Sequence, residues 1–211
     1  FIHDMLLVPD GNLLLATNDG LFATKIQRGI RRMRFLQNKR VPSDMESLGN
    51  NRVMSLLRSK DGKIYVATYG GGLNVVSSGN LFSDKIRFRA YTMDNGMSTD
   101  IVLALYEDKE GLIWAVSEHG LMSFNPRNAT FTNYIEGTFT KGFSFSECPP
   151  LGINNGKTML FGTTQGVLAV DENTLGKSSY VPKIVFDVPD RISLSPEEKS
   201  LSVSFAAIDY N

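Results

Sequence analysis

Short apolar segments bounded by glycine-containing turns recur along the chain. In the segment 63–68, Ile64 and Val66 would point to one side of a strand, and Tyr65 and Ala67 to the other. Both faces are apolar, which predicts a strand that is covered on both sides. No stretch shows the 3.6-residue apolar spacing of an amphipathic helix over three turns. The pattern therefore predicts an all-β fold.

The same arrangement of turn, apolar strand, turn and apolar strand occurs four times. The four stretches are "DGNLLLATNDGLFAT" (10–24), "DGKIYVATYGGGLNVV" (61–76), "EGLIWAVSEHGLMSF" (110–124) and "NGKTMLFGTTQGVLAV" (155–170). Their leading glycines, Gly11, Gly62, Gly111 and Gly156, are 51, 49 and 45 residues apart. A repeat of roughly 40–50 residues is typical of a β-propeller blade, and an acidic residue or Asn before Gly marks each tight turn.

Two further strands are expected around each unit. Segments 52–59 and 100–108 precede units, whereas 30–37, 85–93 and 129–136 follow them and alternate apolar with basic or polar residues. Such alternation is expected of a half-exposed outer strand. Four strands per repeat make a propeller blade. The sequence thus predicts about four four-stranded blades, which form part of a larger propeller.

Two of the repeats resemble a known family. "NNRVMSLLRSKDGKIYVATYGGGLNVV" (50–76) and "STDIVLALYEDKEGLIWAVSEHGLMSF" (98–124) are similar to the two-component regulator propeller repeat. That repeat pairs an N-x-V strand with D-x-x-G-x-[IL]-W-[IV]-G-T and a G-G-L turn. Tyr65 and Trp114 fill its aromatic position. The fourth repeat, with Met159 there, departs from the pattern.

The end of the chain carries a second resemblance. "ISLSPEEKSLSVSFAAIDYN" (192–211) resembles the opening strands of the immunoglobulin-like module with conserved tyrosines that follows the propeller in these proteins. The expected organisation is therefore propeller repeats over 1–180, then a linker and the first strands of an Ig-like β-sandwich over 181–211.

The resemblance implies a function. Such proteins are the periplasmic sensor regions of hybrid two-component systems. Their parent chains also hold a membrane span, a histidine kinase and a response regulator, and they control polysaccharide-utilisation genes. It implies an oligosaccharide ligand, a homodimer through the full sensor, no enzyme activity in this segment, and membrane contact only through a span outside it.

Residues for ligand binding are expected on one face of the propeller. The turns between second and third strands share this face with the links between blades, and loops on a rigid scaffold commonly carry function. The candidates are Asn51, Arg52, Tyr69, Asp100, Glu118, His119, Phe145 and Gln165. Their amides, charges and rings suit a sugar, and also almost any polar partner.

Structural interpretations of the same residues remain open. Asn51 and Arg52 could cap the turn that enters a strand. Glu118 and His119 could be ordinary turn residues, because the matching turns contain Asn-Asp, Tyr-Gly and Thr-Gln. Trp114, inside an apolar strand, is expected to pack between blades rather than to form a binding platform.

Composition excludes several other classes. Twenty-two basic residues balance twenty-two acidic ones, so no overall field would attract nucleic acid. With two histidines and one cysteine, we expect no metal site and no cofactor. No catalytic residues are assigned, since the nucleophile elbow and the phosphate-binding loop are absent.

One local charge feature is strong. The basic residues are Arg28, Arg31, Arg32, Arg34, Lys39 and Arg40. They could bind a sulfated or uronic-acid glycan or an acidic protein. The favoured interpretation is an outer strand whose charges discourage edge-to-edge association.

Two other functions are compatible with the fold. A propeller lyase or glycosidase would need carboxylates across a cleft, for which Asp100, Glu118 and Glu147 are candidates. A propeller that binds only proteins is a common use of a repeat scaffold.

Overall fold

The structure is a computed structural model that describes residues 1–26, 33–134, 142–171, 183–187 and 204–208. The chain divides into two compact units, Phe1–Glu172 and Asn173–Asn211. In the described ranges all regular structure is β, apart from the 3-10 turn η2 (Met93–Asn95). None of the helices in these ranges has the length and hydrophobicity needed to cross a membrane.

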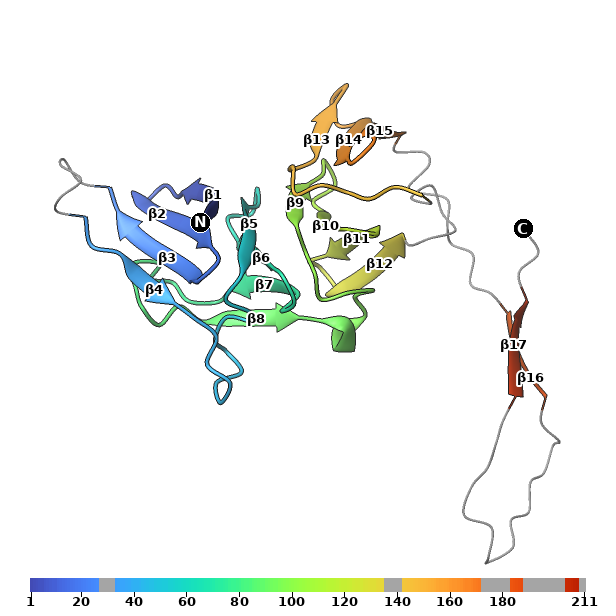
Figure 1. The fold of residues 1–211 in the computed structure, drawn as a ribbon, viewed down its shortest axis with the longest axis horizontal. Helices are drawn as coiled ribbons and strands as arrows, with labels where there is room; N and C mark the ends of the chain where they lie inside the picture. Colours follow the sequence, from blue (N-terminus) through green and yellow to red (C-terminus); the bar gives the residue numbers. More distant parts are fainter. Residues whose placement is uncertain (27–32, 135–141, 172–182, 188–203, 209–211) are drawn as a thin grey trace, which may run out of the picture. The chain divides into compact units, whose positions relative to one another are not determined.

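Three four-stranded antiparallel sheets follow one another in the first unit (Figure 1). The first holds β1 (Ile2–Leu7), β2 (Asn12–Thr17), β3 (Gly20–Lys25) and β4 (Leu36–Asn38). The second holds β5 (Val53–Arg58), β6 (Ile64–Thr68), β7 (Leu73–Val76) and β8 (Phe88–Tyr91). The third holds β9 (Ala104–Glu107), β10 (Ile113–Ser117), β11 (Gly120–Asn125) and β12 (Thr130–Tyr134). In each sheet the strands lie in chain order, which confirms the expected propeller blade.

The fourth sheet has three strands in the described residues rather than the expected four. They are β13 (Leu151–Ile153), β14 (Thr158–Thr163) and β15 (Gly166–Asp171). The inner edge of this sheet is interrupted, because Phe145 pairs with Thr163 and regular pairing resumes only at β13. Pro149 and Pro150 stand in this gap. A proline lacks the N–H that a ladder requires, so continuous pairing cannot pass through them.

The outer strands are shorter than the sequence suggests. β8 and β12 lie inside the expected segments 85–93 and 129–136. In the first blade, however, β4 covers only Leu36–Asn38, where Leu36 opposes Ala23 and Asn38 opposes Leu21. Residues 30–32 of the expected strand 30–37 lie outside the described residues. Alternation of apolar and basic residues alone therefore overestimated this strand.

The hydrophobic core lies between the blades. Ile64 and Val66 of β6 pack in one cluster with residues of the first blade, whereas Tyr65 and Ala67 belong to a cluster shared with the third blade. Every residue of β6 and of β10 is buried. The expected coverage of these strands on both faces is confirmed.

Trp114 is part of this packing. Its ring stacks on Tyr134 at 5.3 Å and meets Phe161 of the fourth blade edge-on at 6.2 Å. Its indole Nε1 donates a hydrogen bond of 2.9 Å to a carboxylate oxygen of Asp108. A buried indole N–H requires such a partner, and the ring serves as core rather than as an exposed platform.

The same hydrogen bond, here called the register bond, occurs once in each of the four blades and marks equivalent positions in them. Near the end of each second strand, a hydroxyl donates to the carbonyl of a glycine across the turn, at 2.8–3.0 Å. The four pairs are Thr17 with Gly20, Thr68 with Gly72, Ser117 with Gly120, and Thr163 with Gly166.

The register bond corrects the assignment of Met159. Tyr65 and Trp114 stand three residues before the hydroxyl, and in the fourth blade that position is Leu160. Phe161 faces Trp114, so the alternation of a strand directs Leu160 to the opposite face. The aromatic position of the fourth repeat is therefore filled by Leu160 rather than Met159.

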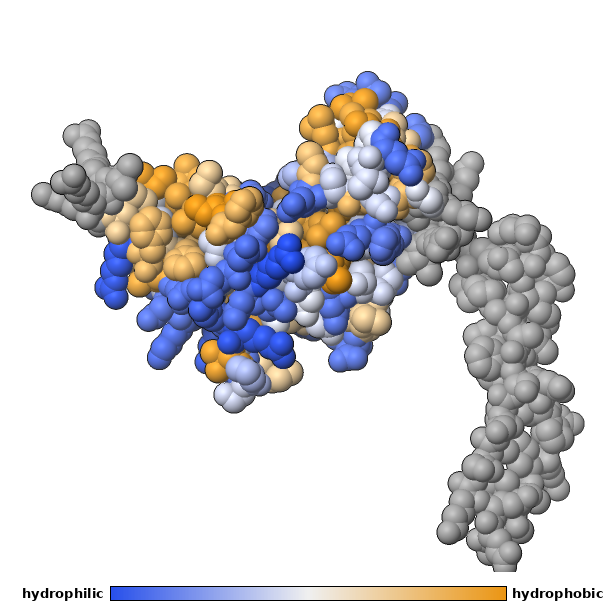
Figure 2. Space-filling model, in the orientation of Figure 1, coloured by the Kyte–Doolittle hydropathy of each residue, from blue (hydrophilic) through white to orange (hydrophobic). Residues whose placement is uncertain are grey.

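The outermost blades carry apolar side chains that no neighbouring blade covers. Met5 and Leu7 of β1 are 63% and 59% exposed, and Val167 of β15 is 71% exposed. Figure 2 shows hydrophobic residues over these two blades. In the repeat, Leu13 of the first blade takes the place of Ile64, which is buried against the preceding blade. This exposure is what blades belonging to a larger propeller would show.

The second unit contains an antiparallel pair, β16 (Lys183–Asp187) and β17 (Ser204–Ile208), in which Lys183 opposes Ile208 and Asp187 opposes Ser204. β16 falls in the segment expected to be linker, and its Val, Ile and Phe residues favour a strand. The Ig-like module stays a prediction, as does the boundary at 180.

Candidate functional site

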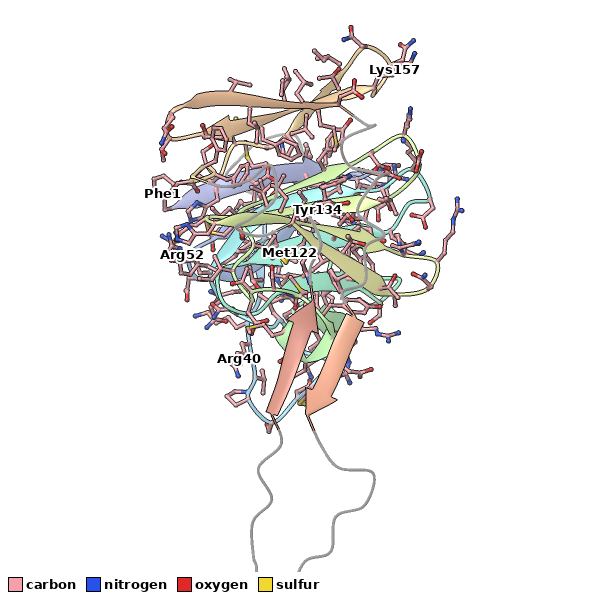
Figure 3. All side chains as sticks on the ribbon, turned by 90° about the vertical axis from the view of Figure 1, so that its right-hand side faces the viewer. Phe1, Arg40, Arg52, Met122, Tyr134 and Lys157 are labelled. Carbon is pink, nitrogen blue, oxygen red and sulfur yellow. The ribbon has the colours of Figure 1, made fainter. Side chains whose placement is uncertain are left out.

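The turns between second and third strands lie on one face, which we call the turn–link face, together with the links from one blade to the next. Figure 3 shows Arg40 and Arg52 on this side of the molecule and Lys157, in a turn between first and second strands, on the other. Backbone hydrogen bonds join each turn to the next link: Gly20 N donates to Asn51 O at 2.6 Å, and Gly72 N to Asp100 O at 2.9 Å. The residues expected to bind a ligand are thus distributed along successive blade junctions.

Asn51 and Arg52 lie at the junction of the first and second blades. The Asn51 side chain accepts a hydrogen bond of 2.7 Å from the backbone N–H of Arg40, so it anchors the preceding link. The Arg52 guanidinium lies 4.2 Å from the centre of the Tyr69 ring, a cation–π contact. The turn at this position is capped by Asn50, whose side chain accepts from Arg52 N at 2.9 Å.

Asp100 fastens the junction of the second and third blades. Its carboxylate accepts a hydrogen bond of 2.7 Å from Met93 N, and its backbone carbonyl accepts from Gly70 N and Gly72 N at 3.0 and 2.9 Å. It therefore positions the link that contains η2 against the turn of the second blade.

The remaining candidates lie around the junction of the third and fourth blades, where Phe145 N donates to Glu118 O and Phe145 pairs with Thr163. The side chains of Glu118 and His119 are 47% and 83% exposed, with Nε2 of His119 3.9 Å from Oε2 of Glu118. Phe145 is buried, packs edge-on against Phe161 at 6.1 Å, and is not available to a ligand on the surface. Gln165 lies on the fourth blade's turn and is exposed. None of these four side chains lines the cleft, described below, that contains Asp100.

Of the carboxylates considered for hydrolysis, Asp100 lies at a different junction from Glu118 and Glu147. Asp100 lies between the second and third blades, whereas Glu118 O accepts from Phe145 N between the third and fourth. Glu147 approaches His3 of β1, with Oε2 3.5 Å from Nδ1. In the described part of the chain no group of three or more metal-binding side chains is assembled.

A cleft of about 270 Å³ opens on the turn–link face beside the second blade. We call it the turn–link cleft. Its lining includes Arg40, Met45, Gly70, Thr92, Asp94 and Asp100. Of the eight residues expected to bind ligand, only Asp100 lines it. Sequence reasoning missed Arg40, Met45 and Asp94 as a group, although the length of the link between β4 and β5 was a signal that could have indicated them.

Bare backbone forms one wall of this cleft. Gly70 and Gly72 have φ angles of 98° and 67°, which favour glycine. A Cβ on Gly71 would overlap the backbone of Gly49, and one on Gly72 would overlap the carbonyl of Tyr91. The sequence "YGGG" therefore lets the turn of the second blade pack directly against its neighbouring links.

Only part of the basic cluster of the sequence lies in the described residues. Arg28, Arg31 and Arg32 lie outside the described residues. Lys39 Nζ lies 2.6 Å from a carboxylate oxygen of Asp19, and hydrogen bonds from Lys39 and Gln37 lower the pKa of Asp19. Arg40 instead belongs to the turn–link cleft.

The segment that forms part of this cleft also matches a family model. Residues 47–70, which include β5, β6 and Gly49 and Gly70 of the cleft wall, match the model described as two component regulator propeller. The match covers the first two strands of the second blade and the start of the turn that follows them.

A curated relative of the chain is histidine kinase P4 of Formosa agariphila. It is 20% identical, and the similarity covers 72% of this chain but only 14% of that protein. The chain thus spans about a seventh of the relative's length.

Two solved structures with TM-scores above 0.5 share the fold of this chain. PorZ, a surface component of the type-IX secretion system of Porphyromonas gingivalis, matches 89% of this chain and 28% of its own at 12% identity, with a TM-score of 0.62. The WD40 β-propeller domain of Doa1 matches 82% of this chain and 52% of its own at 16% identity, with a TM-score of 0.52. The extracellular domain of the putative hybrid two component system BT3049 from B. thetaiotaomicron matches 96% of this chain and 32% of its own at 16% identity, with a TM-score of 0.44.

Proposed function

We propose that this chain is part of the extracytoplasmic, ligand-sensing region of a hybrid two-component sensor, and that it binds an oligosaccharide on the turn–link face. In this proposal the domain itself catalyses no reaction. The signal reaches a histidine kinase across the inner membrane of the cell and controls genes for polysaccharide use. The sensing unit is a homodimer of the full sensor in the periplasm.

The match of residues 47–70 to the two-component regulator propeller is the observation that carries the proposal. The histidine kinase relative supports the same class of protein. The turn–link cleft supports the ligand class, because it combines hydrogen-bonding groups such as Thr92 and Asp94 with the apolar side chain of Met45. A sugar needs both, since its hydroxyls require partners while its C–H faces pack on apolar groups.

Signalling requires that the ligand bind one arrangement of the domain better than another. The turn–link cleft is built from both sides of a blade junction, with Gly70 and Gly71 on one side and Asp100 on the other. Gly70 N and Gly72 N already bind Asp100 O across this junction. A ligand that bridges the two sides would favour the closed junction, which gives a physical route from binding to a change between blades.

Thermal melting of the purified chain against a panel of oligosaccharides tests the proposal. Selective binding to the folded state at about 100 times Kd adds roughly 2.7 kcal/mol, which for a domain of this size raises Tm by about 5–10 °C. The expected result is such a shift for one glycan class, with the glycan recovered unchanged.

Two results would contradict the proposal. Consumption of the glycan would indicate an enzyme. A panel with no shift, together with a stable complex with one protein, would indicate a protein-interaction propeller.

A further inference from the structure

The wall of the turn–link cleft that faces away from the blade is the link 41–48, a loop held in shape by its own hydrogen bonds. The Ser47 hydroxyl accepts from Val41 N at 2.9 Å and lies 2.7 Å from the carbonyl of Asp44. Arg87 of the second blade binds both carboxylate oxygens of Asp44 at 3.1 Å and Glu46 at 3.1 Å. The loop is therefore fixed to the scaffold before any ligand arrives.

This fixed loop exposes an apolar side chain. Met45, at its tip, is 90% exposed and lines the turn–link cleft. Because the hydrogen bonds of the loop fix its backbone, the Met45 side chain stays exposed and does not turn into the protein interior. A methionine side chain adapts to irregular apolar surfaces, so the loop presents a ready apolar contact at the edge of a polar cleft.

The charges of the cleft have a definite balance. Four charged side chains line it: Arg40, Asp44, Asp94 and Asp100. Asp44 is paired with Arg87, which lies outside the lining and also binds Glu46. In the described part of the chain no side chain pairs with the guanidinium of Arg40 or the carboxylate of Asp94. One cation thus stands against two carboxylates, Asp94 and Asp100, which disfavours a negatively charged ligand.

We infer that the turn–link cleft takes an uncharged oligosaccharide, with Arg40 and Asp94 binding its hydroxyls and Met45 packing on the apolar face of a sugar ring. This inference rests on the proposed function and names its ligand class. A guanidinium supplies only donors and a carboxylate only acceptors, so the pair matches neighbouring hydroxyls, which are both. In this inference Arg40 binds the hydroxyls of a neutral sugar, rather than the acidic groups of a sulfated or uronic-acid glycan.

The test compares two variants on two ligand classes by titration calorimetry of the full chain. The neutral probes are linear hexasaccharides of glucose, xylose and mannose; the acidic probes are oligogalacturonides and sulfated oligosaccharides of similar length. For a neutral ligand, Asp94→Asn removes a charged acceptor and is expected to weaken binding by about tenfold. For an acidic ligand, the same change would remove repulsion and strengthen binding.

The variant Arg40→Gln separates the classes a second time. It is expected to lower the affinity for a neutral glycan by about tenfold at most. The affinity for an acidic glycan would fall much more, because the glycan would lose its only countercharge in the cleft. Asp84→Asn is the matched control, because Asp84 is exposed beside the opposite side of the loop and does not line the cleft. Its affinity is expected to equal that of the unchanged chain.

The outcomes are distinguishable from failure of the proposed function. If an acidic glycan binds tightly and binds still more tightly to Asp94→Asn, the inference of an uncharged ligand is wrong, whereas the proposed function as a sugar sensor stands. If a neutral glycan binds and neither Asp94→Asn nor Arg40→Gln weakens its binding, the turn–link cleft is not the binding site. Absence of binding by every probe removes the proposed function and this inference together.

Discussion

At the scale of single residues, the glycines of the second blade's turn are the most constrained positions on the turn–link face. Gly72 has a positive φ and a Cβ there would overlap the carbonyl of Tyr91. The turn cannot move away without breaking the bond from Gly72 N to Asp100 O. The requirement for glycine is therefore steric as well as conformational.

We expect Gly72→Ala to destabilise the chain by about 2–4 kcal/mol, because it combines backbone strain with a backbone overlap. Urea unfolding followed by circular dichroism measures the change. Gly79→Ala is the matched control: Gly79 has open space around its Cβ position and no positive φ, so its change should lie within about 0.5 kcal/mol of zero. Equal stability of the two variants would contradict the role assigned to this turn.

A second residue-scale prediction concerns pH. Hydrogen bonds from Lys63 and Ser59 lower the pKa of Asp61 from 3.8 to about 2. A lowered folded-state pKa gives stability that is present above pH 4 and is lost as pH falls toward 2. Since Asp61 is half exposed, its contribution should stay below about 1 kcal/mol.

The stability of Asp61→Asn relative to the unchanged chain, measured by urea unfolding between pH 2 and pH 6, tests this. The deficit of the variant should be greatest above pH 4 and shrink toward pH 2. A deficit that grows on acidification would show that another interaction dominates at this turn.

At the scale of strands, β14 shows how far the sequence could predict the fold. The glycine turns and two-sided apolar strands were sufficient for blades two and three, because Tyr65 and Trp114 stand equally far from the leading glycine and from the register hydroxyl. In the fourth repeat Gly156 and Thr163 are one residue farther apart. Counting from the glycine placed Met159 at the aromatic position, whereas the hydrogen bond of Thr163 places Leu160 there.

The two faces of β14 should therefore respond differently to truncation. Phe161 is fully buried against the third blade, so Phe161→Ala is expected to cost about 3–5 kcal/mol. Leu160, its neighbour on the other face, is only partly buried, and Leu160→Ala should cost under about 1.5 kcal/mol. Urea unfolding of both variants decides, and a larger loss for Leu160→Ala would reverse the assigned orientation of the strand.

The turn–link cleft marks the limit of sequence reasoning at this scale. Arg40, Met45 and Asp94 come from links, which do not share the repeated pattern of the blades. Asp100 could be anticipated because it enters a predicted strand. The others could not, since their proximity depends on how Arg87 and Ser47 fold the loop. The predictions for Phe145 and Asn51 illustrate the same point. The burial of Phe145 and the contact of the Asn51 side chain with the backbone of Arg40 became visible only in three dimensions.

At the scale of the whole first unit, the two outermost blades are the places where apolar surface faces solvent. Met5 and Val167 belong to blade faces whose counterparts in the second and third blades are buried. Exposed apolar patches of this kind promote association. The exposed face of the first blade differs from that of the fourth. A contact between the first blade of one copy and the fourth blade of another would therefore be heterologous, and association would proceed head to tail.

We expect Met5→Glu with Val167→Glu to reduce self-association of the chain without loss of Tm. Sedimentation velocity across a hundredfold range of concentration measures association, and calorimetry measures Tm. Leu14→Glu, at a fully buried position between the first two blades, is the contrasting variant and should unfold the unit. Unchanged association in the double variant would show that these blade faces are not adhesive.

The hydrogen bonds that close the 41–48 link have a consequence for how recognition can change. Asn51 holds the start of the link through Arg40 N, and Ser47 holds Val41. Between these anchors Arg87 holds Asp44 and Glu46, so an exposed position such as Met45 can vary while the loop around it stays fixed. Such a position is suited to diversification: a library of substitutions at Met45 would alter the edge of the turn–link cleft while inheriting an unaltered frame, which makes the link a natural starting point for engineered binding proteins.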